Sequence, residues 1–273
     1  MRISVIITTY QSPHWLEKVL WGYIHQTFQN FELIIADDGS DKKTAQLIQN
    51  YTNKGIKIEH IWQPDKGFRK TRILNKAILA AKGNYLVFTD GDLIPRSDFL
   101  YAHHSHAKVG RFLSGGCIRL PLNTSHTITV NDVVSERAFS VRWLQSNGAR
   151  IKSMTKLLVP YWASTFADKI TTTRSTWNGG NASGWKQDII SINGFDERME
   201  YGGEDRELGE RLENAGIHGI QIRHRAICIH LDHPRSYICK NAIKRNIEIR
   251  KTTKTKKIIR TEYGIKKNFS DSQ

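Results

Sequence analysis

Residues 85–92 constrain the fold of this chain more than any other stretch. A run of β-branched, aromatic and aliphatic residues at 85–89 is typical of a buried strand in a parallel sheet. The strand ends in Asp90-Gly91-Asp92, where the glycine allows a sharp turn between two carboxylates. Two acids beyond the carboxyl end of such a strand suit a divalent cation shared with nucleotide phosphates. A solvated Asp-Gly turn gives the same pattern, so the motif alone leaves both interpretations open.

The first half of the chain alternates predicted strands with predicted helices. Apolar runs predict strands at 3–9, 31–36, 57–62 and 85–89. Helical spacing of apolar residues predicts helices at 13–23, 43–51 and 68–82. This alternation is the signature of βαβ units with right-handed crossovers, and it predicts an α/β fold with a mostly parallel sheet.

Acidic and basic residues mark the ends of these elements. Asp37 and Asp38 end the second strand, at the same sheet edge as the acids after the fourth strand. This layout fits a nucleotide, with one acid accepting from the base or ribose and another holding a metal. Arg69, Lys70 and Arg72 open a basic helix and could bind phosphate, although a solvated helix face explains them equally simply.

The second half is less periodic. A helix is predicted at 97–108 and a strand at 112–119, and 120–176 is rich in Ser, Thr and isolated aromatic residues. We interpret 120–176 as a variable, substrate-facing region, the alternative being an ordinary helical excursion with core aromatics. Paired glycines at 179–180 allow close backbone approach to a ligand, and the polar residues just after them offer hydrogen bonds of the kind that sugars need.

A predicted helix begins at Glu204 and Asp205, behind a glycine turn. The two acids either act on a substrate or merely cap the helix. The helix N-terminus is expected to keep Asp205 ionised, whereas a nearby diphosphate would act the other way. Spacing predicts i,i+4 pairs on exposed faces, which are Arg206 with Glu210 and Glu207 with Arg211.

A last strand, predicted at 226–229, delivers His230, and His233 follows closely. A histidine at a strand end could complete a metal shell begun by Asp92. A lone histidine is more often structural.

The charge of the chain indicates an anionic partner. The net charge is +15, and 240–273 holds eleven Lys or Arg against three acids, with isoleucines interleaved. This basic tail is either an amphipathic segment on an anionic membrane surface or a solvated, partly frayed helix.

The sequence contains neither an apolar run long enough to cross a bilayer nor a recognisable signal peptide, so a cytoplasmic location is expected. Cys117, Cys228 and Cys239 lack disulfide or zinc spacing and are expected to be reduced thiols packed as small hydrophobic residues.

Together the motifs resemble the glycosyltransferase family 2 enzymes of GT-A fold. The second half resembles the galactosyltransferase-type C-terminal region shared with β-1,4-galactosyltransferases and bacterial chondroitin-type polymerases. The resemblance covers residues 1 to about 235 and rests on motifs at 8–10, 37–40, 67–75, 90–92, 179–183, 193–195 and 202–205. It implies a donor-binding half at 1–119, an acceptor-binding and catalytic half at 120–235, and a basic tail at 236–273.

The resemblance also implies residue roles. Thr9, Tyr10 and Asp37 match residues that hold the uracil and ribose of a UDP-sugar, and Asp90 matches an acid that contacts the ribose and donor sugar. Further donor contacts are expected from Arg69, Arg72, Asn75, Gly180 and Asn181.

The metal and the catalytic base are implied in the same way. Asp92 matches a direct ligand of Mn²⁺ (or Mg²⁺), and His230 matches a later histidine ligand, with His233 as the alternative. Asp205 matches the catalytic base, and Glu204 lies beside it on the acceptor or donor sugar.

Two departures from the family pattern concern specificity. Tyr201 stands where several relatives have tryptophan in the acceptor site. Leu74 precedes Asn75, where some relatives have arginine, which leaves open whether Arg69 or Arg72 makes that contact.

The function implied is inverting, metal-dependent transfer from a UDP-sugar to a surface glycan such as lipopolysaccharide or capsule, at the inner face of the cell membrane. The alternatives are a nucleotidyltransferase acting on sugar phosphates and a nucleic-acid-binding protein. A nucleotidyltransferase would prefer a glycine-rich phosphate loop after the strand at 3–9, and the sequence has none there. A nucleic-acid-binding protein would leave the acids at the strand ends unexplained. Nucleic acid is therefore not an expected partner.

Overall fold

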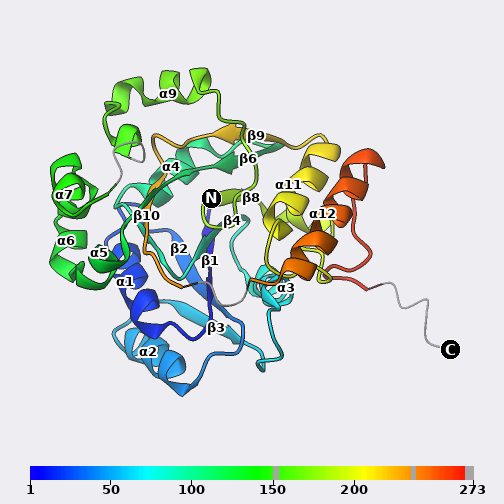
Figure 1. Ribbon diagram of the computed structural model, residues 1–273, viewed down its shortest axis with the longest axis horizontal. Coiled ribbons are helices and arrows are strands. Elements are labelled where there is room, and N and C mark those ends of the chain that lie inside the picture. Colours follow the sequence, from blue (N-terminus) through cyan, green and yellow to red (C-terminus); the bar gives the residue numbers. More distant parts are fainter. Residues whose placement is uncertain (150–153, 235–237, 268–273) are drawn as a thin grey trace.

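The structure is a computed structural model that describes residues 1–149, 154–234 and 238–267. Its centre is a seven-stranded sheet of order β3-β2-β1-β4-β8-β6-β9 (Figure 1). Its strands are β1 (Ile3–Thr9), β2 (Phe31–Asp37), β3 (Ile58–Trp62), β4 (Tyr85–Asp90), β6 (Arg111–Ser114), β8 (Ala182–Trp185) and β9 (His218–Gln221). The first four are mutually parallel, and β8 runs antiparallel to both of its neighbours. The predicted α/β fold with a mostly parallel central sheet is confirmed.

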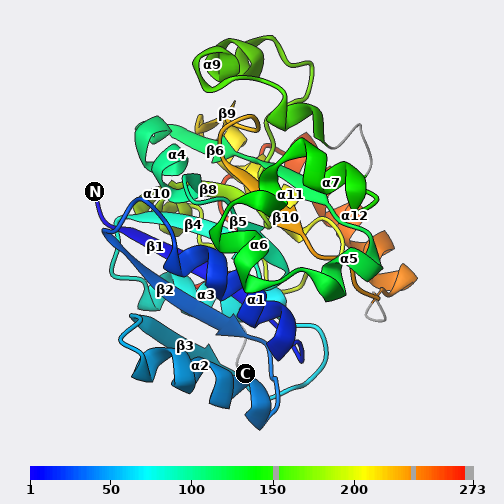
Figure 2. The ribbon, with the colours of Figure 1, turned by 90° about the vertical axis from the view of Figure 1, so that its left-hand side faces the viewer.

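Both faces of the sheet are covered, which explains why its strands are apolar at nearly every position. Side chains of Ile3, Val5 and Ile7 pack toward α1 (Pro13–Ile24) and α2 (Lys42–Asn53). Ile6, on the opposite face, packs toward α3 (Lys70–Ala80) and α11 (Glu204–Asn214). Figure 2 shows α1 and α2 lying over the first strands. The three helices predicted in this half are confirmed to within about two residues at most ends.

A second, three-stranded sheet has the order β5-β10-β7. Its strands are β5 (Leu93–Pro95), β7 (Gly116–Arg119) and β10 (Ile227–His230). The prediction of a single strand at 112–119 is therefore wrong. Strand pairing is interrupted at Gly115, so this stretch contributes β6 to one sheet and β7 to the other. Antiparallel pairing of β10 with β5 sets His230 opposite Leu93, next to Asp92. This small sheet brings together two parts of the chain that lie far apart in sequence.

The described part of segment 120–176 forms short helices, as the interpretation of a helical excursion predicts, and its role toward a substrate stays a prediction. The elements are α5 (Leu122–Thr127), α6 (Val130–Val134), η1 (Arg137–Phe139), α7 (Val141–Ser146), η2 (Thr155–Leu157) and α9 (Tyr161–Ile170). Val133, Phe139 and Leu144 are buried in the core, as in an ordinary helical excursion. The helix α9 instead stands away from the sheets in both views and exposes Trp162 (Figures 1 and 2).

The basic tail is an integral part of the domain. Its helix, α12 (Lys240–Thr255), packs along α11 (Figure 1). Elsewhere, the chain forms the helices α4 (Phe99–His106) and α10 (Lys186–Ser191). Asn246 of α12 is fully buried, and Arg250 lies against Glu210 of α11. The expectation of a frayed helix is wrong for 240–255, because these residues form a continuous helix that buries Ala242, Asn246 and Thr253, while most of its other residues are solvent-exposed.

The pair Glu207–Arg211 also corrects an expectation. Both side chains are buried, with Arg211 0% and Glu207 1% exposed, and Arg211 Nε donates to Glu207 Oε1 over 2.8 Å. Arg211 also donates to the carbonyl oxygens of Ile192 and Gly194, each over 2.6 Å. The pair is buried because α12 covers this face of α11. The other predicted pair does not form, since Glu210 takes Arg250 as its partner.

The cysteines are free thiols, as expected. Cys228 is buried and Cys117 is half-buried, whereas Cys239 is exposed and does not pack as a hydrophobic residue. Among the described residues no helix combines the length and apolar character needed to span a bilayer.

Candidate active site

The carboxyl ends of β1 and β4 open into a cleft of about 880 Å³. Thr8 and Asp90 are register partners in the parallel pair β1–β4, so their side chains meet at the floor of this cleft. The Thr8 hydroxyl donates to Asp90 Oδ1 over 2.5 Å. The crevice lies where open α/β sheets bind ligands, outside the carboxyl ends of the strands.

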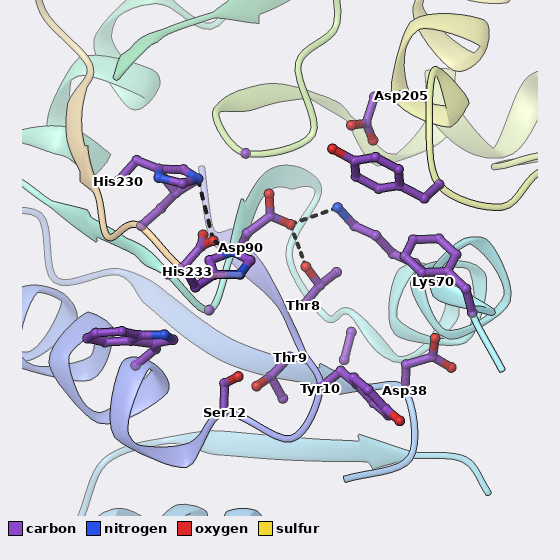
Figure 3. Close-up of a pocket in the computed structure, with 18 of the residues that line it drawn as sticks. Thr8, Thr9, Tyr10, Ser12, Asp38, Lys70, Asp90, Asp205, His230 and His233 are labelled. Atoms are coloured by element: carbon purple, nitrogen blue, oxygen red, sulfur yellow. Dashed lines mark hydrogen bonds and ion pairs between the residues drawn. The ribbon is translucent and has the colours of Figure 1, made fainter. Parts of the chain in front are cut away.

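Lys70, in the first turn of α3, reaches across the cleft to the same carboxylate. Its ammonium donates to Asp90 Oδ1 over 2.8 Å, as Figure 3 shows. Burial alone would raise the pKa of Asp90, but Lys70 and Thr8 hold that pKa below its ordinary value. Burial opposes the charge of Lys70 too, yet Asp90, Asp205 and Glu204 hold its pKa well above the ordinary value. The cleft floor therefore carries the positive charge of Lys70, with Asp90 on one side and Asp205 and Glu204 on the other.

Asp205 lies on the far side of Lys70 from Asp90 in Figure 3, in the first turn of α11. Burial raises the pKa of Asp205 to about 7, the Glu204 carboxylate adds to the effect, and Lys70 opposes it. The expectation that the helix N-terminus keeps Asp205 fully ionised is thus wrong, because burial and a like charge outweigh the helix dipole. A carboxyl group that titrates near 7 is suited to accept a proton from a hydroxyl.

Glu204 is more deeply placed than its neighbour. It is 5% exposed, and its Oε2 accepts from the backbone N–H of Gly202 over 2.9 Å. It therefore holds the turn before α11 and places negative charge beside Asp205. Glu204 thus closes the turn while Asp205 lines the cleft, and action of either acid on a substrate stays a prediction.

A carboxylate and two imidazoles meet on the opposite side of Asp90 from Lys70. His233 Nε2 lies 2.8 Å and His230 Nε2 lies 3.5 Å from Asp92 Oδ2, and the candidate ligand atoms all lie within 4.8 Å of one another. Asp92 Oδ1 is buried without a hydrogen-bond partner within the described residues. An unsatisfied carboxylate oxygen beside two imidazoles fits a divalent cation. The structure brings both histidines to Asp92, so it does not select one of them.

The expected nucleotide residues divide into two groups. Thr9 and Tyr10 lie along one wall of the cleft, together with Ser12 and Asp38 (Figure 3). Asp37 does not line the cleft, because its side chain is fully buried and accepts from the Ser40 N–H over 2.8 Å. The adjacent acid Asp38 is the one that faces the cleft.

Asp37 is instead part of the support beneath this wall. Its Oδ2 lies 3.0 Å from Nε2 of His60, on the neighbouring strand β3. Asp38 accepts from Arg69 N over 2.7 Å and from Gln63 Nε2 over 2.6 Å. These contacts fix the loop between β2 and α2 against the start of α3.

Three other residues expected to contact the donor lie outside the cleft. Arg72 is exposed on the outer face of α3, and Arg69 donates to the Pro64 carbonyl. Asn75 is buried and exchanges hydrogen bonds with the backbone of Phe195, donating over 2.9 Å and accepting over 2.8 Å. Of the cations at the start of α3, Lys70 is the one that lines the cleft, because its position in the helical turn faces the sheet.

Of the paired glycines before β8, Gly180 lines the cleft, and both leave room for neighbouring side chains. A Cβ at Gly179 would lie 2.3 Å from Asp205 Oδ1, and one at Gly180 would lie 2.5 Å from Leu93 Cδ1 and 3.1 Å from Asp90 Oδ2. Asn181 is fully buried and donates to the carbonyl oxygens of Gly116 and Ala226 over 2.9 and 3.0 Å. Its side chain therefore joins the two sheets.

The cleft thus combines a carboxyl group poised to take a proton, a cation, and a set of metal-binding side chains, all within one crevice. Such a set is suited to displacing a charged leaving group with a hydroxyl nucleophile. The signals for Thr8 and Asp38 were present in the sequence as polar residues at strand ends, but only the strand register identifies which of them face the cleft.

Comparison with known proteins assigns this arrangement to a class. Residues 4–146 match the family described as glycosyl transferase family 2, and residues 164–234 match the N-terminal domain of galactosyltransferase. The chain belongs to glycosyltransferase family 2. The predicted family and GT-A fold are confirmed.

Individual relatives are more distant. Validoxylamine A glucosyltransferase of Streptomyces hygroscopicus subsp. jinggangensis is 26% identical over 79% of this chain and 52% of the relative. Hyaluronan synthase of Pasteurella multocida is 26% identical over 81% of this chain and 24% of the relative. Chondroitin synthase of Escherichia coli is 25% identical over 79% and 33%. The chain spans about half the length of these relatives or less.

Solved structures agree on the fold. S. aureus TarS 1-349 in complex with UDP-GlcNAc superimposes with a TM-score of 0.63 at 14% identity, covering 95% of this chain and 70% of that fragment. The mannosyltransferase PcManGT of Pyrobaculum calidifontis, in complex with GDP-Man and Mn²⁺, gives a TM-score of 0.58 at 18% identity over 86% and 58%. At these identities the likeness concerns the fold alone.

Proposed function

We propose that this protein is an inverting, metal-dependent glycosyltransferase that moves a sugar from a UDP-sugar to a hydroxyl of a surface glycan, of lipopolysaccharide or capsule type. The observation that carries the proposal is the placement of Asp205 and the Asp92 cluster on opposite sides of the Lys70–Asp90 pair, in one cleft. A donor bound across this pair would have its diphosphate near the cluster and its sugar near Asp205.

Asp205 takes the proton of the acceptor hydroxyl as the oxygen forms its bond to the anomeric carbon. The bond from that carbon to the diphosphate breaks on the opposite face, so the configuration inverts. Lys70 lies where negative charge builds on the leaving group and stabilises it. Asp92, His230 and His233 would hold a divalent cation, which would supply further positive charge to the diphosphate.

Thr9, Tyr10 and Asp38 would bind the base and ribose. They line the cleft wall furthest from Asp205, and the Tyr10 ring is 47% exposed, so it is available for stacking. The donor UDP-GlcNAc of one structural neighbour and GDP-Man of another make uracil the base to test first and guanine the second.

The acceptor class is proposed from the relatives. Two of them are named as synthases of the polysaccharides hyaluronan and chondroitin. Nucleotidyl transfer to a sugar phosphate is the alternative reaction at such acids, and membership of family 2 favours glycosyl transfer.

The test is nucleotide release from a panel of UDP-sugars and GDP-mannose, with Mn²⁺ and with a chelator, using slow donor hydrolysis where no acceptor is supplied. Manganese-dependent release from one or two donors is expected, and an Asp92→Asn protein is the negative control. Absence of both release and nucleotide binding in the presence of Mn²⁺ would overturn the proposal.

We further propose that α12 rests on an anionic membrane surface. Lys240, Lys244, Ile247 and Lys251 are exposed and fall within one narrow stripe of the helix by their spacing. Replacing the three lysines with alanine should weaken binding to vesicles that contain phosphatidylglycerol and leave nucleotide binding unchanged. Equal vesicle binding by both proteins would remove the membrane role of α12, and the inner face of the cell membrane as its location.

A further inference from the structure

A second cavity, of about 1000 Å³, adjoins the donor cleft. The two cavities share Asn178 and Cys117 as lining residues. Asp205 lines the first cavity and Arg206, the next residue, lines the second. A molecule in the second cavity would therefore lie next to the start of α11, which carries Asp205.

The walls of this cavity are strongly basic. Seven Lys or Arg side chains line it, against two Glu. Both acids are already engaged: Glu210 pairs with Arg250 and Lys254, and Glu213 accepts from Gly219 N and contacts His218. The remaining cations are Lys156, Arg174, Arg206, Arg223 and Lys257.

Several of these cations are not neutralised. Within the described residues, the side chains of Arg174, Arg206 and Lys257 have no hydrogen-bond or ion-pair partner, and all three are exposed. Arg223 donates to Thr173, a neutral hydroxyl. Lys156 is 8% exposed and donates to the Cys117 carbonyl over 3.0 Å. Burial and the nearby Arg223 lower the pKa of Lys156.

The cavity floor is rigid and uncharged. It contains Trp177, which is fully buried, and Gly209 of α11, where a Cβ would lie 2.6 Å from Trp177 Cβ. Cationic walls around an uncharged floor suit a sugar chain that carries negative groups, because guanidinium groups bind the anions.

From these observations we infer that the second cavity binds an acceptor glycan bearing anionic groups, carboxylate or phosphate, and aligns its reactive hydroxyl with Asp205. This inference rests on the proposed function in one respect, namely that Asp205 receives the acceptor. It goes further in assigning the charge of the acceptor and the residues that select it. Guanidinium groups bind carboxylate and phosphate in the same bidentate manner, so the walls alone fit either group.

The experiment compares binding of four probes by the full-length protein with Mn²⁺ and UDP present. The probes are a dextran oligomer, its carboxymethyl derivative, its phosphorylated derivative, and a single-stranded DNA of similar length. Both charged dextrans, or one of them, should bind at least about tenfold more tightly than neutral dextran, and added salt should weaken that binding. The difference between carboxymethyl and phosphorylated dextran identifies the anionic group.

The variant Arg174→Ala/Arg206→Ala should bind charged and neutral dextran nearly equally and keep its affinity for UDP. The matched control is Lys42→Ala/Lys43→Ala, which removes the same charge from exposed positions on α2, away from the cavity. Equal binding of charged and neutral dextran by the unmodified protein would overturn the inference. So would equal losses in variant and control, since net charge would then explain the effect, or tighter binding of DNA than of either dextran.

Failure of the proposed function has a different signature. Loss of UDP and GDP binding in the presence of Mn²⁺ would overturn the transferase proposal and the acceptor role together, whatever the dextran preference. Normal UDP binding without a charge preference would overturn the acceptor inference alone.

Discussion

The ammonium group of Lys70 lies 2.8 Å from Asp90 Oδ1 and is the positive charge between the metal-binding cluster and Asp205. This contact joins the first turn of α3 to the end of β4, across the floor of the cleft. The charge of Lys70 compensates the buried Asp90 carboxylate. It also holds the pKa of Asp205 below the value that burial alone would give.

Replacing Lys70 with methionine should therefore slow nucleotide release about 100-fold, because a fixed positive charge near the leaving group is lost. The pKa of Asp205 should rise, so the acidic limb of the pH–rate profile should move to higher pH. Arg72→Met, in the same helix but exposed and outside the cleft, is the control and should stay near the unmodified rate. Equal rates for the two variants would remove Lys70 from the mechanism.

The transfer rate should increase as pH rises through about 7, the pKa to which burial raises Asp205, since the base acts in its ionised form. Asp205→Asn should lower transfer about 100-fold or more and leave UDP binding intact. A pH–rate profile measured with a known donor tests this increase in rate. Transfer by Asp205→Asn at the unmodified rate would place the base elsewhere.

The same substitution should also change stability in a pH-dependent way. A folded-state pKa above the ordinary value means that the folded protein holds its proton longer than the unfolded chain, so stability falls as pH rises from about 4 to about 7. At pH 8, Asp205→Asn should melt a few degrees above the unmodified protein, and the gap should narrow as pH falls toward 5. A difference in melting temperature that grows as pH falls would contradict the argument that burial raises the pKa of Asp205.

The metal-binding cluster predicts that two histidines share one role. His230→Gln and His233→Gln should each lower the affinity for Mn²⁺ at least about tenfold, and Asp92→Asn should lower it further. Calorimetric titration of Mn²⁺ measures this without any sugar donor. His25→Gln, at an exposed position just after α1 and outside the cleft, should bind as the unmodified protein does. If only one of the two histidine variants is affected, the other histidine serves to orient its neighbour.

The helix α12 should stabilise the active site through its contacts with the residues that precede α11. Asn246 Nδ2 donates to the carbonyl oxygens of Glu200 and Gly202 over 2.9 and 3.2 Å, just before the turn that starts α11. Asn246→Ala should lower the free energy of unfolding by about 1–3 kcal/mol, because it leaves buried carbonyls unpaired. It should also reduce the transfer rate more than donor affinity. Lys244→Ala, exposed on the same helix, is the control for both measurements.

The sequence by itself determined the first strands of the sheet, the first helices and the polar residues at strand ends. Those features follow from local periodicity and turn residues, which depend on a few neighbouring positions. The run 85–89 with its two acids, and the apolar run 3–9, therefore gave an α/β sheet and the edge where a ligand binds. The motif order gave the family.

Only the tertiary structure decided which polar side chain faces the cleft. Asp38 rather than Asp37, and Lys70 rather than Arg69 or Arg72, line it, because strand register and helical phase set side-chain direction. Contacts between distant segments decided the rest. Pairing of β5 with β10 brings both histidines to Asp92, and packing of α12 on α11 buries Glu207 with Arg211. Such contacts depend on how whole elements pack, and no local pattern in the sequence encodes them.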